Sequence, residues 1–262
     1  MKRLYGVLLV VMMSMVSGCQ QKAHDDLRVG VIAGPEAELM NVAAKVAHDK
    51  GLEVTVVEFS DYTIPNTALN EGSLDANMFQ HNAYLQETIK QRHYPLVSIA
   101  KTYLYPMGLY SKKIKELSEL PEHAVVAIPN DPTNEARALL LLQKAKLIKL
   151  KEMNQQALTT QAIISNPKQL NIKEMDAAEL PRTLDDVSLA AINTNYAVSA
   201  GLTPSKDALF VEDKTAPYAN LLVVKEETKD DPRYKVLIEA LHSKQVQETA
   251  KTLFNNEAVQ AW

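Results

Sequence analysis

The sequence of 262 residues contains a single cysteine, Cys19. One cysteine cannot form a disulfide within the chain, and a thiol enzyme would have to use this residue as its nucleophile. The chain also lacks the G-x-S-x-G, H-E-x-x-H, P-loop and G-x-G-x-x-G motifs. Its six histidines stand apart, and no pair has the spacing of zinc ligands. These absences argue against most hydrolases, nucleotide-binding enzymes and metalloenzymes, and the sequence calls for neither a cofactor nor a metal.

Two narrower classes are also disfavoured. The segment 165–168 (Ser-Asn-Pro-Lys) has the S-x-x-K spacing of penicillin-recognising enzymes. Its companion motifs are absent, and Pro167 would disturb the helical turn that must join the serine to the lysine. No Lys/Arg-rich segment interleaved with aromatic residues is present, so nucleic acid is not an expected partner.

The N-terminal residues have the pattern of an export signal. Lys2 and Arg3 precede an apolar run that is too short to span a bilayer. Small residues then precede Cys19, as in the lipobox of bacterial lipoproteins, where the cysteine is lipidated and becomes the first residue of the mature chain. We therefore predict a lipoprotein signal peptide at 1–18 and a polar tether at 19–26. An unlipidated signal peptide or a short anchor is the alternative.

The rest of the chain is long enough for two domains, or for one large α/β unit. Over all 262 residues, the 46% hydrophobic and 23% charged content is typical of an ordinary folded protein. Removal of residues 1–18 leaves 26 basic side chains against 32 acidic ones, so the mature chain carries a net charge of about −6.

Strand and helix patterns alternate along this part of the chain. Residues 27–33, 36–50 and 52–59 predict a strand, a helix and a strand, which indicates a parallel sheet with a right-handed crossover. The alternation continues and predicts an α/β fold of two lobes, with sheets covered on both faces. Further strands are expected at 74–79, 96–100, 124–128, 170–175, 189–192, 209–211 and 221–224, and further helices at 66–70, 81–92, 132–146, just before 166, at 180–186, at 195–200 and within 231–262.

The chain is expected to cross between the lobes twice. Segment 103–110 combines strand formers with a proline and a glycine, which is typical of a domain crossing. The second crossing is expected at 224–226, after the last apolar strand. These crossings place lobe 1 at 27–106 and 226–262, and lobe 2 at 107–225.

A turn between a strand and a helix carries a candidate anion site. Asp131 is expected to cap the helix, and Pro132 to take its first position without losing a hydrogen bond. The leucines at 139–142 make the helix apolar all round and therefore buried. Arg137 thus stands near the start of a buried helix, where free amides bind anions and a guanidinium can fork onto a carboxylate with a two-pronged edge. An arginine that reaches into water is the alternative interpretation.

Aromatic and amide residues follow several of the predicted strands. They are Tyr62, Phe79, His81 and Tyr84 in the first half, and Asn193 and Asn220 in the second. Taken singly, each is more often a cap, turn or core residue. Together, at the sheet edge where α/β proteins bind ligands, they predict a pocket that is aromatic on one lobe and polar on the other. Such a pocket suits a small zwitterion, with its carboxylate on Arg137, its ammonium on an amide oxygen of Asn193 or Asn220, and its apolar side chain among the aromatic rings.

The mature chain resembles the NlpA/MetQ family of methionine-binding lipoproteins along essentially its whole length. The resemblance is specific because many ordered segments carry it. These segments are 28–32 (RVGVI), 75–81 (DANMFQH), 105–106 (YP), 110–115 (YSKKIK), 129–134 (PNDPTN), 139–144 (LLLLQK), 180–186 (LPRTLDD), 192–194 (INT) and 210–214 (FVEDK).

The resemblance implies a two-lobed periplasmic-binding-protein fold of type II-like form, with the ligand cleft between the lobes. The lobes would close on L-methionine and deliver it to an inner-membrane ABC permease and its ATPase. It also implies that the seven residues Tyr62, Phe79, His81, Tyr84, Arg137, Asn193 and Asn220 line the pocket, and that a lipid on Cys19 holds the protein to the membrane. Glu135 departs from the family pattern. A carboxylate there would repel the ligand carboxylate, so we expect it to face solvent.

Other ligands and roles are compatible with the sequence. A methionine-containing dipeptide, D-methionine or another small amino acid is an alternative ligand within the family. A periplasmic hydrolase and a surface-interaction lipoprotein are alternatives from other classes. The missing nucleophile motifs disfavour the first, and the pocket pattern disfavours the second. The predicted location is the periplasmic side of the cell envelope, and Gln20 after the cysteine resembles the outer-membrane sorting pattern of some Gram-negative bacteria.

Overall fold

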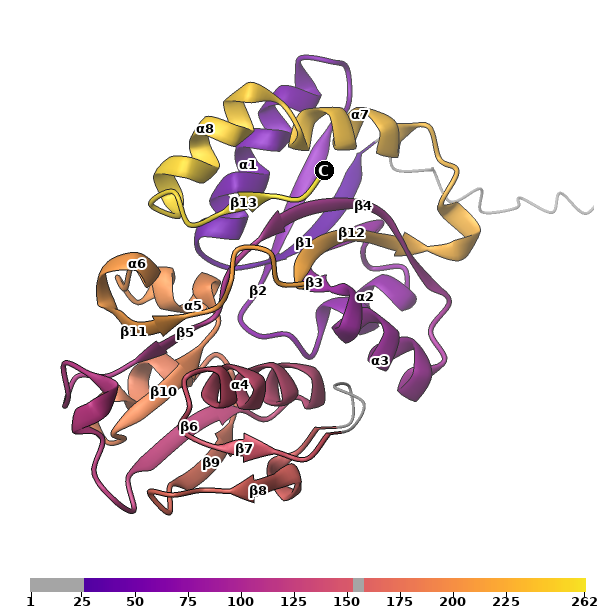
Figure 1. Ribbon diagram of the computed structural model, residues 1–262. Helices are drawn as coiled ribbons and strands as arrows, with labels where there is room; N and C mark the ends of the chain where they lie inside the picture. The colour runs from indigo at the N-terminus through magenta and orange to yellow at the C-terminus, as the bar shows by residue number, and fades with distance from the viewer. Residues whose placement is uncertain (1–25, 153–157) are drawn as a thin grey trace, which may run out of the picture.

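The computed structural model describes residues 26–152 and 158–262. The predicted signal peptide, Cys19 and all of the tether except Asp26 lie outside these residues. None of the helices in the described part has the length and apolar character that crossing a membrane requires. The chain forms two main sheets with helices packed on them, and a short third sheet (Figure 1).

The first sheet has six strands in the order β13-β4-β12-β3-β1-β2. β1 runs parallel to β2 and β3, and α1 connects β1 to β2, so the predicted strand–helix–strand unit is confirmed. β12 is antiparallel to both of its neighbours, β3 and β4. The bounds are β1 Leu27–Ile32, β2 Val54–Phe59, β3 Ala76–His81, β4 Leu96–Leu104, β12 Ala219–Lys225 and β13 Val259–Gln260.

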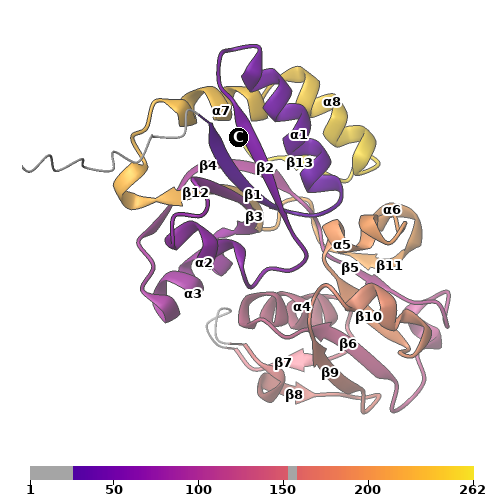
Figure 2. The same ribbon diagram turned by 180° about the vertical axis from the view of Figure 1, so that it is seen from behind.

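Helices cover both faces of this sheet. Helices α1 (Pro35–His48), α7 (Arg233–Leu241) and α8 (Lys244–Leu253) lie on one face, as Figures 1 and 2 both show. Helices α2 (Pro65–Asn70) and α3 (Asn82–Arg92) lie on the other. Strand β1 is therefore almost continuously apolar, because a strand with two covered faces has no solvent side.

The second sheet has the order β11-β5-β10-β6-β9. Helix α4 (Pro132–Lys144) packs on the face that carries Val126 and Ile128 of β6, whereas Ala127 faces the opposite side. That side is covered by the 3₁₀ helix η4 (Leu180–Asp185) and by α5 (Thr194–Ser199). The strands are β5 Gly108–Tyr110, β6 Val125–Pro129, β9 Asn171–Met175, β10 Leu189–Ile192 and β11 Ala208–Val211, and the short helix α6 (Pro204–Asp207) precedes β11.

The chain passes between the two sheets at 105–107, the first crossing, and at 212–218, the second crossing. The second crossing precedes β12, so the expected boundary at 225 is wrong for residues 219–225. Leu222 and Val224 of β12 pack in the cluster under α1, while Leu221 and Val223 pack on the opposite face with α2 and α3. The apolar run predicts a strand correctly, but its pairing with β3 and β4 depends on distant residues.

Three segments contain structure that the sequence did not predict. Just before residue 166, where a short helix was expected, the described residues form β7 (Lys149–Leu150), the 3₁₀ helix η3 (Thr160–Ala162) and β8 (Ile163–Ser165), and β7 pairs with β8 to form the small sheet. Residues 153–157 of this segment lie outside the described residues. Residues 180–185 form a 3₁₀ helix rather than an α-helix. The closing segment ends in β13 after its two helices, because the edge of β4 offers unpaired backbone groups.

The C-terminal segment 254–262 contacts both crossings. The Phe254 ring stacks on that of Tyr105 in the first crossing, with ring centroids 4.4 Å apart. The carboxylate of Glu257 pairs with Lys214 Nζ of the second crossing at 3.4 Å. At the chain end, the Trp262 ring stacks on His242 with centroids 4.0 Å apart. The last nine residues thus link the first sheet to the two connections between the sheets.

Candidate ligand-binding site

A cavity lies between the two sheets, where the strands of both lobes end. All seven residues predicted from the sequence line it: Tyr62, Phe79, His81, Tyr84, Arg137, Asn193 and Asn220. The other lining residues are Gln80, Tyr105, Asn134, Thr194 and Asn195. The structure therefore brings together residues from both halves of the chain, at the strand ends where α/β sheets place their ligands.

Three rings form an aromatic cage on the side of the first sheet. The centroid of Tyr62 lies 5.8 Å from that of Phe79 and 6.1 Å from that of Tyr84, and Phe79 and Tyr84 are 5.6 Å apart. Tyr84 donates its hydroxyl to the carbonyl of Tyr62 at 2.9 Å. Tyr62 donates its own hydroxyl to Asn195 Oδ1 at 2.8 Å. The phenols are thus held at their polar ends, and their ring faces are left for apolar contact.

His81 joins the cage to the polar side of the cavity as a neutral ring. It is the N-cap of α3, and its Nδ1 accepts from the backbone N–H of Tyr84 at 3.2 Å. The proton of the neutral ring is therefore on Nε2, which lies 3.4 Å from Asn134 Oδ1. Burial lowers the pKa of His81 to about 3, and the nearby charge of Arg137 acts in the same direction.

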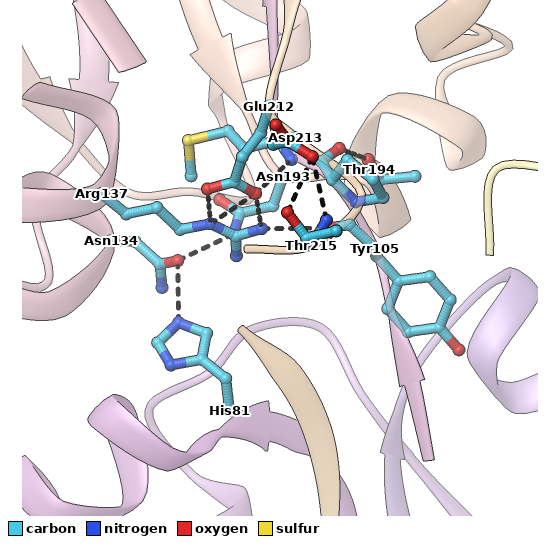
Figure 3. Close-up of polar contacts among 11 residues, drawn as sticks. His81, Tyr105, Asn134, Arg137, Asn193, Thr194, Glu212, Asp213 and Thr215 are labelled. Carbon is cyan, nitrogen blue, oxygen red and sulfur yellow. Dashed lines mark hydrogen bonds and ion pairs between the residues drawn. The ribbon is translucent and has the colours of Figure 1, made fainter. Parts of the chain in front are cut away.

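Arg137 is held by both crossings (Figure 3). Its Nε and Nη2 donate to the carboxylate of Glu212, with the shortest contact at 2.6 Å, and Nη2 also donates to the carbonyl of Tyr105 at 2.9 Å. The Tyr218 ring lies under the guanidinium, 4.4 Å from Cζ to the ring centroid. Nη1 makes no hydrogen bond to any residue in the described part of the chain. The Nε and Nη2 edge of the guanidinium, which was expected to bind a ligand carboxylate, thus binds Glu212 instead. Nη1 is the nitrogen that remains for a ligand.

The start of α4 orients two amides toward the cavity. Asp131 caps the helix as predicted, accepting from Asn134 N at 3.0 Å, and its two oxygens also accept from Asn134 Nδ2 at 3.1 and 3.0 Å. Asn134 Oδ1 consequently points away from the cap and accepts from Asn193 Nδ2 at 2.9 Å. Since Asn193 uses its nitrogen in this way, its Oδ1 is buried without a partner among the described residues. This oxygen is an acceptor available to a ligand.

Asn220 has a partner that the sequence did not reveal, the carboxyl of Glu36. Glu36 lies in the first turn of α1 and is 1% exposed. Its Oε1 accepts from Asn220 Nδ2 at 2.9 Å, and its Oε2 has no partner among the described residues. Burial raises the pKa of Glu36 to about 8, and the hydrogen bond from Asn220 offsets only part of this effect. The turn before it requires Gly34, whose φ is +101°.

Glu135 is not where we expected it. Its side chain does not face solvent, because the residue is 6% exposed and its Oε1 accepts from the backbone N–H of Thr160 at 3.0 Å. It caps the segment that leads into β8, and it is absent from the lining of the cavity. The carboxylate therefore lies away from the cavity, although by packing rather than by exposure.

Sequence reasoning missed two carboxylates near the cavity, Glu36 and Glu212. Both follow a strand directly or after a short turn, β1 for Glu36 and β11 for Glu212. The strand-end rule that identified the aromatic and amide residues would have found them as well, had it been applied to acidic side chains. Their partners are 184 and 75 residues away in the sequence, so the pairings themselves carry no local signal.

Residues 27–262 match the family model of the NlpA lipoprotein. The D-methionine-binding lipoprotein MetQ of Salmonella typhi is 51% identical over 252 residues, which span 94% of this chain and 93% of the relative.

Two solved structures are also similar to the chain. The crystal structure of the methionine binding protein MetQ has 50% identity and a TM-score of 0.89, over 91% of this chain and 98% of that chain. The structure of a nutrient binding protein from Burkholderia cenocepacia bound to methionine has 50% identity and a TM-score of 0.88, over 90% of this chain and 100% of that chain.

Proposed function

The chain belongs to the NlpA lipoprotein family, and from this premise we propose that it captures methionine outside the cytoplasm and delivers it to an ATP-binding-cassette importer. Its role is binding and delivery, without a chemical reaction. The similarity to a D-methionine-binding lipoprotein and to a structure bound to methionine supports this ligand.

The cavity has the three kinds of group that a methionine zwitterion needs. The cage of Tyr62, Phe79 and Tyr84 suits a thioether, since each sulfur–aromatic contact is worth about 0.3 to 1.5 kcal/mol. Nη1 of Arg137 suits the carboxylate. The observation that carries the proposal is the buried, unpartnered Oδ1 of Asn193 in the same cavity, because an acceptor without a donor is costly unless a ligand such as an ammonium supplies one.

Calorimetric titration tests the proposal. We use the mature chain 19–262 carrying Cys19→Ser, so that no lipid is added. L-methionine is expected to bind at one site with measurable heat, and competition with D-methionine and methionine-containing dipeptides ranks the alternative ligands. If none of these compounds gives heat and none competes for the site, the proposed function is contradicted.

We further propose that the two lobes close around the ligand by bending at the two crossings. Lobe 1 then comprises the first sheet with its helices, and lobe 2 the residues between the crossings. The hydrogen bond from Tyr62 to Asn195 already joins the lobes next to the cavity. The closed form would dock on an inner-membrane permease that carries its own ATPase. A lipid on Cys19 would keep the protein at the membrane surface.

Tyr84 is predicted to limit the length of the ligand side chain. Tyr62 and Tyr84 line both the site and a second cavity of about 140 Å³ between α2, α3 and the start of α4. Tyr84→Ala should join the two cavities and lower the affinity for L-methionine. It should also shift the ratio of affinities, on the order of tenfold, in favour of a methionine homologue that has three more methylenes on sulfur. The reason is that each buried methylene is worth about 0.8 kcal/mol. Competition calorimetry with both ligands measures this ratio.

Tyr84→Phe is the matched control for this prediction. It retains the ring that separates the cavities and removes only the hydrogen bond to the carbonyl of Tyr62. Its ratio of affinities should stay within about twofold of the wild type. A similar ratio in Tyr84→Ala and Tyr84→Phe would show that the ring is not the barrier.

A further inference from the structure

Glu36 is a buried carboxyl without a cationic partner. It forms no salt bridge in the part of the chain that the structure describes, and its surroundings include the phenols of Tyr62, Tyr105 and Tyr196. Its one hydrogen bond goes to Asn220. A carboxyl in such a place is costly for the fold, and its contribution must therefore be sought in what it does to Asn220.

The carboxyl determines which way the Asn220 amide points. An amide has a donor end and an acceptor end, and which end faces a given neighbour follows from the hydrogen bonds available. Glu36 Oε1 accepts from the Nδ2 end of Asn220, which it can do either as the carbonyl oxygen of a neutral carboxyl or as a carboxylate oxygen. The Oδ1 end is thereby turned away from Glu36. It makes no hydrogen bond to a described residue, and Asn220 lines the cavity.

We propose that Glu36 is a positioning residue for the ligand ammonium and acts through Asn220. By holding Nδ2, it keeps Oδ1 presented as an acceptor to the same cavity that the acceptor oxygen of Asn193 faces. The site then selects ligands with a free α-ammonium over otherwise identical carboxylates that lack it. This role rests on the proposed function, because it assumes that a zwitterion occupies the cavity.

The test compares two ligands in three variants of the mature chain carrying Cys19→Ser. One ligand is L-methionine, and the other is its des-amino analogue, which retains the thioether and the carboxylate. Glu36→Met removes the acceptor for Asn220 Nδ2. It should lower the affinity for L-methionine about tenfold or more, in line with the loss of a hydrogen bond to a charged group. It should lower the affinity for the des-amino analogue less than about threefold. Asn220→Ala should show the same selectivity. The double variant Glu36→Met with Asn220→Ala should bind L-methionine as tightly as Asn220→Ala does, within about twofold, because Glu36 acts through Asn220.

Rescue separates positioning from a merely structural role. Glu36→Gln can still present an oxygen to Asn220 and should recover most of the preference for the ammonium that Glu36→Met loses. Thermal denaturation confirms that each variant is folded, and Glu36→Ala replaces Glu36→Met if the latter does not fold.

Two results would overturn the role of Glu36. They are equal losses for the two ligands in Glu36→Met, and losses that simply add in the double variant. A wild-type chain that binds neither ligand overturns the proposed function and this role together. If the wild type binds L-methionine and Glu36→Met loses affinity for both ligands equally, only the role of Glu36 is overturned.

Discussion

Replacing Arg137 by methionine is expected to lower the free energy of unfolding by about 3 to 5 kcal/mol, the usual cost of removing one member of a buried ion pair. The side chains of Arg137 and Glu212 are only 4% and 9% exposed. The variant leaves the Glu212 carboxylate buried, with the backbone N–H of Met107 as its remaining donor. Urea denaturation at neutral pH measures the change.

The same variant should also lose affinity for L-methionine by about 1.5 to 3 kcal/mol, the range for a hydrogen bond to a charged group. In our proposal Nη1 alone meets the ligand carboxylate, while the other two nitrogens stay on Glu212 and Tyr105. Stability and affinity therefore report on different edges of one guanidinium. Unchanged affinity in a folded Arg137→Met chain would place the carboxylate elsewhere.

Two further variants separate charge burial from loss of the side chain. Arg137→Met with Glu212→Gln removes the stranded charge and should restore a substantial part of the lost stability. Arg182→Met is the matched surface control, since Arg182 pairs with Glu179 at 3.0 Å but is 79% exposed. That control should change stability by less than about 0.5 kcal/mol. Equal losses at Arg137 and Arg182 would refute the importance of burial.

Glu36 is expected to make the protein less stable as pH rises. Its pKa is about 8 in the folded protein, against 4.5 as its ordinary value. A carboxyl whose pKa is raised in this way makes its full contribution to the free energy of unfolding below pH 4.5. That contribution is lost as the pH rises to about 8. Glu36→Gln abolishes this loss, so it should be more stable than the wild type by an amount that grows with pH and reaches the order of 4 kcal/mol.

The difference between the two chains is the quantity to measure, because His81 titrates in the opposite sense. Its pKa of about 3 lies below its ordinary value of 6.5, so its contribution is present above pH 6.5 and is lost as pH falls. Urea denaturation from pH 5 to 9 on both chains cancels that effect. Glu38→Gln, at an exposed position on the same helix, should leave the slope unchanged. A constant difference between wild type and Glu36→Gln across this range would contradict the prediction.

Local chemistry explains what the sequence could predict. Asp131 caps α4 and Pro132 opens it, because capping involves residues three positions apart. Phe79 and His81 lie at the end of β3 and Asn193 follows β10 of the second sheet, and all three line the cavity because the strand ends of both sheets face it. The cavity lining could thus be assembled from short patterns once the α/β alternation was recognised.

The remaining features depend on residues far apart in the chain. β12 reads as a strand, but only its insertion between β3 and β4 shows to which sheet it belongs. Glu135 was expected in solvent, and its burial follows from the backbone of Thr160, which no local pattern places beside it. The engagement of Arg137 by Glu212 has the same origin. Sequence reasoning identified Arg137 as important but assigned its two-pronged edge to the ligand rather than to the protein.

The contacts of the C-terminal segment decide how the protein should be labelled in experiments. Phe254 and Glu257 contact one crossing each, and Trp262 is stacked on His242 rather than projecting freely. A fluorophore, affinity tag or surface linker attached after Trp262 would therefore pull on the two connections that bend in the proposed closure. Attachment through the segment before β1 avoids this, and it also mimics the direction from which a lipid on Cys19 would hold the molecule.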